Sequence, residues 1–178
     1  MSTGQRQSTS VQVRWMIRRD MADVLEIERE SFEYPWSEED FLNCLRQRNC
    51  IGMVAEHEGR VVGFMIYELF KAKLHVMSFA VANRLRRTSI GSQMIEKLIN
   101  KLSQQRRHSI SLEVRETNLK AQLFFQKQGF RAVSVLRDFY EDTLEDAYQM
   151  EYHLDQEDIS LPFAGPHNRI ASFESELG

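Results

Sequence analysis

The segment from Leu74 to Leu102 constrains the fold most, because it joins a buried strand to an amphipathic helix through a basic turn. Residues 74–81 are rich in apolar side chains on both faces, which predicts a central strand of a sheet. The turn that follows, residues 84–92, carries arginines, hydroxyl residues and Gly91. Apolar residues then recur at helical spacing as far as Leu102. This pattern requires a sheet with helices packed on it.

The remainder of the middle region alternates strand and helix patterns in the same way. Asp20, Ser37 and Asn118 are each suited to begin a helix as its N-cap, and Gly129 is suited to end one. The expected strands are residues 13–17, 51–57, 61–69, 74–81, 109–115, 131–136 and 147–154, with Glu58-Gly59 as a hairpin turn. The order β-α-α-β-β-β-α-β-α-β-β predicts an α+β, or mixed α/β, domain around one sheet.

The chain divides into three zones. Residues 1–12 are rich in Ser, Thr and Gln without periodicity, so we expect a disordered leader. Residues 13–154 form the expected single domain, a size for which one core suffices. Residues 155–178 contain prolines and scattered polar residues, and we expect a flexible tail.

Charge and cysteine content exclude several classes of function. The net charge of −3 gives no overall attraction to nucleic acid or to an anionic membrane. No apolar run approaches the ~18 residues that span a bilayer, and the leader has no secretory pattern. The two cysteines, Cys44 and Cys50, suit reduced thiols. We therefore predict a cytoplasmic protein, as a monomer or weak dimer.

The turn at residues 84–92 is the first candidate site. The unpaired N–H groups at a helix N-terminus attract anions, and Arg86 and Arg87 add charge suited to phosphate oxygens. Gly91 lets the backbone approach a ligand closely. The alternative is an ordinary basic surface turn. The segment is no P-loop, since it lacks the Gly-Lys-Ser/Thr ending.

Residues 109–115 alternate strictly and carry the second candidate site. Ile110, Leu112 and Val114 point to one face of the expected strand, so Glu113 and Arg115 point to the other. A strand carboxylate beside a ligand groove is placed to accept a proton. The alternative is a solvated carboxylate.

Four motifs in order resemble the GNAT superfamily of N-acetyltransferases, and within it the ribosomal-protein-alanine N-acetyltransferases. Residues 86–91 resemble the pyrophosphate motif Arg/Gln-x-x-Gly-x-Gly/Ala, after a typical strand Ser78-Phe79-Ala80-Val81. The other three matches are Phe32-Glu33-Tyr34-Pro35-Trp36, Leu112-Glu113-Val114-Arg115-Glu116-Thr117-Asn118 and Phe124-Phe125-Gln126-Lys127-Gln128-Gly129-Phe130. The resemblance covers residues 13–153.

The resemblance implies the GNAT fold, with a central mixed sheet of about six or seven strands flanked by about four helices. It implies acetyl-CoA as co-substrate and Glu113 as general base. It also implies cofactor contacts from the main chain of one strand, from the basic turn and from an asparagine side chain. The implied positions are Phe79, Ala80, Val81, Arg86, Arg87, Thr88, Ser89, Ile90, Gly91, Ser92 and Asn118.

The expected acceptor is the N-terminal amine of a protein, with an alanine-starting ribosomal protein as the specific candidate. A free α-amine has a pKa of about 7.7–8.0 against about 10.4 for lysine, so it is partly deprotonated at neutral pH. No cysteine lies near the motifs, which disfavours an acyl-enzyme, and the five histidines lack the spacing of metal ligands. The alternatives are acetylation of a small amine or lysine, and a weakened module that only binds acetyl-CoA.

Two residues depart from the family pattern. Ser89 replaces a glycine, and it is strained if that position needs a positive φ; alternatively its hydroxyl caps the helix or contacts phosphate. Phe125 replaces a tyrosine that the subgroup uses to protonate the leaving thiolate. Tyr140 matches a family aromatic near the substrate, so it is a candidate for this role; it also suits simple packing in a peptide groove.

Overall fold

The computed structural model describes residues 8–154, and these form one seven-stranded mixed sheet. The strands lie in the order β1-β2-β3-β4-β5-β7-β6, and every neighbouring pair is antiparallel except β4 and β5. Their bounds are β1 Gln12–Trp15, β2 Cys50–His57, β3 Arg60–Leu69, β4 Lys73–Val81, β5 Ser109–Arg115, β6 Arg131–Tyr140 and β7 Glu145–His153. The predicted order of helices and strands is confirmed.

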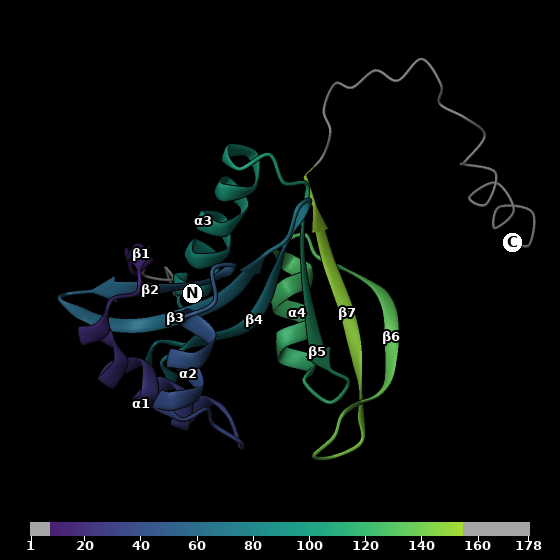
Figure 1. The fold of residues 1–178 in the computed structure, drawn as a ribbon, viewed down its shortest axis with the longest axis horizontal. Helices are drawn as coiled ribbons and strands as arrows, with labels where there is room; N and C mark the ends of the chain where they lie inside the picture. Colours follow the sequence, from purple (N-terminus) through teal and green to yellow (C-terminus); the bar gives the residue numbers. More distant parts are fainter. Residues whose placement is uncertain (1–7, 155–178) are drawn as a thin grey trace, which may run out of the picture.

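Four α-helices cover the two faces of the sheet (Figure 1). Their bounds are α1 Met21–Ser31, α2 Glu38–Leu45, α3 Ile90–Gln104 and α4 Leu119–Lys127, and two 3₁₀ turns occupy Arg18–Asp20 and Asn83–Leu85. One face of the sheet carries α1 and α2, and the other carries α3 and α4. No helix in residues 8–154 is long and apolar enough to cross a membrane.

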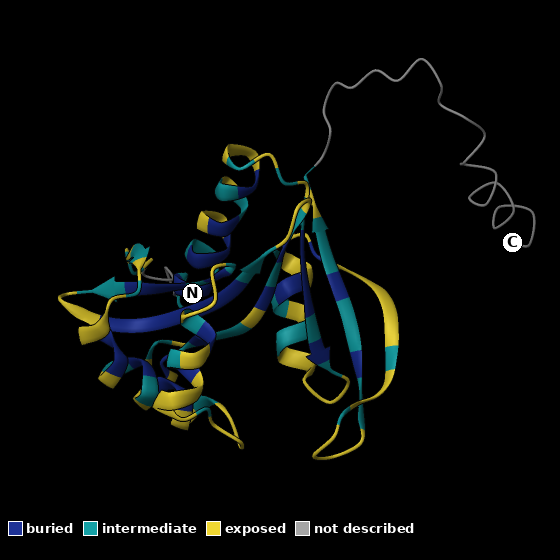
Figure 2. Ribbon diagram, in the orientation of Figure 1, coloured by how far each residue is buried: buried dark blue, intermediate teal, exposed yellow. Residues whose placement is uncertain are grey.

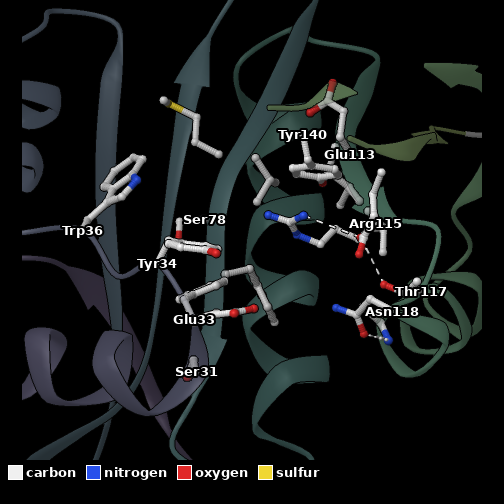
Figure 3. Close-up of a pocket in the computed structure, with 18 of the residues that line it drawn as sticks. Ser31, Glu33, Tyr34, Trp36, Ser78, Glu113, Arg115, Thr117, Asn118 and Tyr140 are labelled. Atoms are coloured by element: carbon white, nitrogen blue, oxygen red, sulfur yellow. Dashed lines mark hydrogen bonds and ion pairs between the residues drawn. The ribbon is translucent and has the colours of Figure 1, made fainter. Parts of the chain in front are cut away.

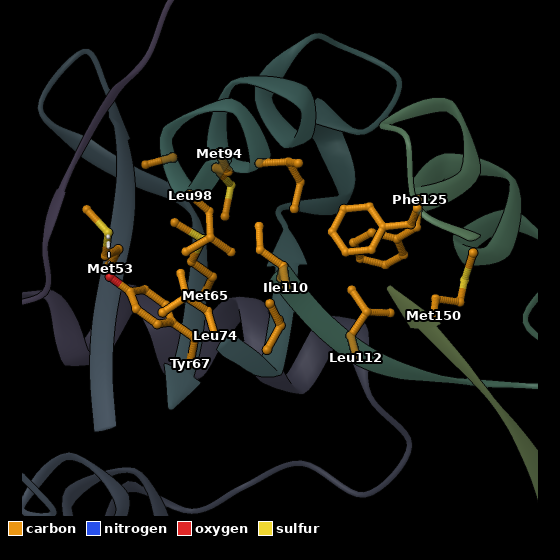
Figure 4. Packing of buried hydrophobic residues seen from close by; sticks show 14 of the residues in the cluster. Met53, Met65, Tyr67, Leu74, Met94, Leu98, Ile110, Leu112, Phe125 and Met150 are labelled. Carbon is orange, nitrogen blue, oxygen red and sulfur yellow. Dashed lines mark hydrogen bonds between the residues drawn. The ribbon is translucent and has the colours of Figure 1, made fainter. Parts of the chain in front are cut away.

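Strand alternation divides the core into two layers, and buried residues concentrate on the inner strands and on the inner faces of the helices (Figure 2). On β3, Met65 and Tyr67 pack beneath α3, whereas Phe64 and Ile66 pack against α1 and α2. The layer under α3 and α4 also contains Ile110 and other aliphatic residues of β5 (Figure 4). The predicted alternation of residues 109–115 is confirmed.

The ladder between β4 and β5 is short and determines where a ligand has room. These two strands pair only at Lys73–Ser109, Leu74–Ile110 and His75–Ser111, and then diverge. Beyond His75, the edge of β4 that faces β5 therefore has no strand partner there. On its other edge β5 stays paired with β7 along its whole length, Ser109 to Arg115.

Two of the three expected helix caps form as predicted. The Ser37 hydroxyl accepts a hydrogen bond from the Asp40 N–H at 3.2 Å, and the Asp40 carboxylate accepts one from the Ser37 N–H at 2.8 Å. The Asn118 side-chain oxygen accepts from the Ala121 N–H at 3.2 Å. Asp20 occupies the N-cap position of α1 without a side-chain cap bond, so the prediction for this side chain is wrong.

The Asp20 carboxylate is occupied elsewhere, which explains why it does not cap. It is buried and forms two hydrogen bonds with the Arg14 guanidinium, at 2.8 and 2.9 Å. It also accepts from the Ile17 N–H at 2.8 Å. Arg14 in turn reaches Glu56 on β2, with its Nε 2.8 Å from the carboxylate. This network ties β1, β2 and the start of α1 together.

The end of the predicted leader lies against α3. The Val11 N–H donates to the Gln93 side-chain oxygen at 3.1 Å, and the Gln93 amide donates to the Thr9 carbonyl at 2.6 Å.

Cys44 and Cys50 are free and buried, with their sulfur atoms 2.6 Å apart. The predicted tail, residues 155–178, and residues 1–7 lie outside the described residues.

Candidate active site

A cavity of about 530 Å³ fills the space where β4 and β5 separate. Its walls come from α1 and the loop after it, from the diverging halves of β4 and β5, from the start of α4, and from the end of β6 with the following turn. Figure 3 shows Tyr34 and Trp36 on one side of the cavity and Glu113, Arg115 and Tyr140 on the other. Segments far apart in the sequence thus meet around one space.

Glu113 lies in this cavity paired with a histidine that sequence reasoning missed. The distance between Glu113 Oε2 and His75 Nε2 is 2.6 Å, and His75 Nδ1 lies 3.7 Å from a carboxylate oxygen of Glu68. Both members of the close pair are largely shielded, with side-chain exposures of 24% for His75 and 17% for Glu113. The hydrogen bond that His75 donates to Glu113 raises the pKa of His75 above its usual value, against the opposing effect of burial.

Arg115 and Tyr140 form a second cluster on the same wall. The Arg115 guanidinium carbon lies 3.9 Å from the centre of the Tyr140 ring, which is a cation–π contact. The guanidinium also donates to Asp142 at 3.2 and 2.7 Å and to Thr143 at 2.9 Å. Burial raises the pKa of Tyr140, with Arg115 acting in the opposite direction. Tyr140 therefore keeps its phenolic proton at neutral pH.

The opposite wall depends on a buried carboxyl of α1. Glu28 is 3% exposed, and its Oε1 accepts a hydrogen bond from the Trp36 N–H at 2.9 Å, which fixes the loop between α1 and α2. Its other oxygen has no hydrogen-bond partner among the described residues. Burial raises the pKa of Glu28, and the Trp36 N–H partly offsets this effect. Tyr34 and Trp36, which belong to the motif Phe32-Glu33-Tyr34-Pro35-Trp36, both line the cavity.

Aromatic rings form the end of the cavity next to α4. Phe125 is buried, and its ring centroid lies 5.7 Å from Phe79, 5.0 Å from Phe124 and 5.4 Å from Phe130. All three arrangements are edge-to-face, the geometry that aromatic rings prefer. Phe125 thus offers an apolar surface to the cavity.

The basic turn differs from expectation in its backbone. Ser89 has φ −81°, so serine meets no left-handed strain there, and its hydroxyl makes no cap bond. Instead it contacts the Ser8 hydroxyl at 3.2 Å and the Gln93 amide at 3.0 Å. The residue with positive φ is Arg87, at 63°.

Gly91 and Arg86 serve contacts inside the protein. A Cβ on Gly91 would come within 3.0 Å of the Phe124 ring, so this glycine is required for α3 and α4 to approach one another. The Arg86 guanidinium donates to the Val81 carbonyl at 3.2 Å and to the Ser31 hydroxyl at 3.0 Å. This side chain therefore ties the turn to β4 and α1.

The predicted site residues fall into two groups. Phe79, Glu113, Asn118 and Tyr140 all line the cavity. The remaining positions lie outside its lining, at the end of β4, in the basic turn and in the first turn of α3: Ala80, Val81, Arg86, Arg87, Thr88, Ser89, Ile90, Gly91 and Ser92. No metal-binding cluster of His, Cys, Asp and Glu occurs among residues 8–154.

Comparison with known proteins places the chain among acetyltransferases. Residues 21–130 match the acetyltransferase (GNAT) family. An uncharacterised N-acetyltransferase of Methanocaldococcus jannaschii is 34% identical, over 78% of this chain and 88% of its own. A putative [ribosomal protein bS18]-alanine N-acetyltransferase of Bacillus subtilis is 27% identical, over 80% and 95%. The crystal structure of the ribosomal-protein-S18-alanine N-acetyltransferase from Escherichia coli shares the fold, with a TM-score of 0.76, 23% identity and coverage of 86% and 100%.

Proposed function

The chain belongs to the acetyltransferase (GNAT) family as an acetyl-CoA-dependent N-acetyltransferase, and we propose that its acceptor is the N-terminal α-amine of a protein. The specific acceptor that we propose is the N-terminal alanine of a small-subunit ribosomal protein, because relatives named for that activity match most of the chain. Glu113, which lines the cavity and is paired with His75, carries the proposal that this chain is a working catalyst.

The residues present fit acetyl-CoA in two places. The edge of β4 beyond His75 has no partner in β5, so its main-chain groups are available to an extended amide-bearing ligand. At the start of α3, the first N–H groups of a 15-residue helix have no intrahelical partners, and Arg84 and Arg87 supply positive charge nearby. Asn118 lies in the cavity wall, as the N-cap residue of α4. When bound, acetyl-CoA supplies the acetyl thioester.

Glu113 is proposed as the general base. It lines the cavity from β5, and its Oε2 lies 2.6 Å from His75 Nε2, a contact that holds the carboxyl group in place. A carboxylate so held accepts the proton of the incoming amine directly or through one water. Because an α-amine has a pKa near 8, about a tenth of it is neutral at pH 7 before any help from the enzyme.

Tyr140 is proposed as the proton donor to the leaving thiolate, in place of the tyrosine that Phe125 replaces. We expect Tyr140→Phe to lower kcat about tenfold or more, with little change in the KM of the acceptor peptide. The expected loss is smaller than the typical general-acid effect of about 100-fold or more, because a thiolate whose thiol has a pKa of about 8.5 is already a tolerable leaving group. Steady-state kinetics with a saturating acetyl-CoA concentration would measure both constants. A raised peptide KM at unchanged kcat would assign Tyr140 to peptide binding instead.

The matched variant is Phe125→Tyr, which restores a hydroxyl beside the aromatic cluster. In the Tyr140→Phe background, this second change should recover part of the lost kcat. If it recovers none, Phe125 does not stand where a proton donor is useful.

The acceptor class is tested directly with peptides. Purified protein and acetyl-CoA are mixed with peptides that begin with Ala, Ser or Met, and with an N-terminally blocked peptide that contains lysine. We expect acetylation of the free α-amine, fastest for Ala, detected as a mass increase on the first residue. Acetylation of only the blocked peptide would overturn the proposal, and cofactor binding without transfer to any amine would point to a weakened binding module.

A further inference from the structure

More carboxyl groups line the cavity than the proposed chemistry needs. Four carboxyl residues line it, and we call them the acidic lining: Glu28, Glu33, Glu113 and Glu145. Among residues 8–154, Arg115 is the only lysine or arginine in the same lining. A cavity with this balance favours a ligand that brings positive charge.

Arg115 does not offset the acidic lining, because other groups already neutralise it. Its guanidinium forms two hydrogen bonds with Asp142 and lies 3.6 Å from Glu145. Its planar face covers the Tyr140 ring. Asp142 itself adds a further carboxylate beside the cavity, so the surroundings of Arg115 are net negative.

Two carboxyl groups of the acidic lining lack cationic partners. Glu33 is exposed in the loop between α1 and α2, lines the cavity and has no ion pair among residues 8–154 (Figure 3). Glu28 is 97% buried in the same wall, and its Oε2 has no hydrogen-bond donor in the described part of the chain. A buried oxygen in this state costs free energy until a donor reaches it. The acceptor peptide, which enters this cavity, brings such donors.

We propose that this enzyme selects acceptor N-termini with a lysine or arginine within their first three residues, and that Glu33 is the residue that recognises this charge. The proposal rests on the proposed function, because it assumes that the acceptor is a protein N-terminus. Consecutive residues of an extended peptide are about 3.3 Å apart. Since Glu33 and Glu113 line the same cavity, the second or third side chain of a peptide whose first nitrogen lies beside Glu113 is the one that we propose to meet Glu33.

The expected selectivity follows from electrostatics. A cleft lined by one sign of charge raises the rate of capture of oppositely charged ligands by about 10- to 1,000-fold. The attraction of an exposed carboxylate extends over the Debye length, which is about 30 Å at 0.01 M salt and about 3 Å at 1 M salt. The preference for cationic peptides should therefore be large at low salt and small at high salt.

The experiment uses the full-length protein and three peptides that all begin with alanine, with arginine, alanine or glutamate at the second position. A second set moves the variable residue to the third position. At low salt we expect kcat/KM for the arginine peptide to exceed that for the glutamate peptide about tenfold or more in at least one set. Equal kcat/KM values for all peptides would overturn this inference while leaving α-amine acetylation in place. If no free N-terminus is acetylated, the proposed function itself fails.

Glu33 is tested by exchange of its charge. Glu33→Gln should reduce the arginine-to-glutamate ratio of kcat/KM, and Glu33→Arg should bring it to one or below. Glu26→Gln is the matched control, since Glu26 is an exposed carboxylate of α1 outside the cavity, and this change should leave the ratio as in the wild type. An unchanged ratio in both Glu33 variants would remove Glu33 from acceptor recognition. Circular dichroism of each variant confirms that any change is not a loss of fold.

Discussion

Glu113→Gln is expected to lower kcat about 100-fold or more, because it removes the group that takes the proton from the acceptor amine. Glutamine keeps the size of the side chain and still reaches His75 at its 2.6 Å position, so the cavity keeps its shape. The KM of acetyl-CoA should change little, since Glu113 belongs neither to the edge of β4 nor to the start of α3, the two places that we propose to hold acetyl-CoA. Single-turnover measurements with an alanine-starting peptide separate the chemical step from product release.

The pH dependence of the same variant gives a second readout. Without the carboxylate, only amine that is already neutral reacts, so the rate should follow the amine pKa near 8 and the profile should move to higher pH. His75 reports on the pair independently. Its pKa is raised by Glu113, so its imidazolium persists to higher pH in the wild type, and the NMR titration of His75 should fall back toward the ordinary value of about 6.5 in the variant.

Glu116→Gln is the matched control for this experiment. Glu116 follows β5 directly, is exposed and does not line the cavity, so both kcat and the pH profile should match the wild type. A Glu113→Gln enzyme with wild-type kcat and pH profile would remove Glu113 as the base.

Arg14→Met is expected to lower the free energy of unfolding by about 3 kcal/mol at neutral pH. The change removes both hydrogen bonds to the buried Asp20 and the contact with Glu56, and leaves the Asp20 carboxylate with the Ile17 N–H alone. Removing one partner of a buried ion pair typically costs about 3–5 kcal/mol, and we take the lower end because Arg14 is 21% exposed. Urea denaturation monitored by circular dichroism measures the loss.

Low pH should reduce the difference in the free energy of unfolding between the wild type and Arg14→Met. The Arg14 hydrogen bonds hold the pKa of Asp20 below its usual value, so their stabilisation is fully present above the unfolded value of about 3.9 and is lost as the pH falls through the folded value. The wild type and the variant should therefore converge toward low pH. Arg18→Met is the control, because Arg18 is exposed and its side chain has no partner among the described residues. A loss at neutral pH no larger than the control's would show that the network does not stabilise the fold.

The sequence predicted those parts of the fold that depend on local signals. The Ser37 cap with Asp40 three residues later, the Asn118 cap and the stop at Gly129 each concern one turn of chain, and all are present. The alternation of residues 109–115 placed Glu113 on the face opposite Leu112 before any contact was known. Because successive side chains of a strand point to opposite faces, burial of the apolar residues on one face places all the intervening residues on the other.

What the sequence did not predict depends on contacts between distant segments. His75 and Glu113 are 38 residues apart, and only the short β4–β5 ladder brings them together. Asp20 had the residue type and the position of a cap, but Arg14 competes for its oxygens. β6 continues to Tyr140 rather than ending at Leu136, because its pairing with β7 resumes at Tyr140, opposite Glu145, after a register shift. None of these outcomes is visible in a local pattern.

Because β4 and β5 diverge early, the sheet consists of two parts that are joined by only three residue pairs. The first part contains β1 to β4, and α1, α2 and α3 pack on it. The second part contains β5 to β7, and α4 packs on it. Where β4 and β5 diverge, the main-chain groups of their facing edges form no hydrogen bonds with each other. A ligand bound along this seam therefore adds to the free energy of unfolding. A thioester donor bound along this seam would therefore also stabilise the junction between the two parts of the sheet.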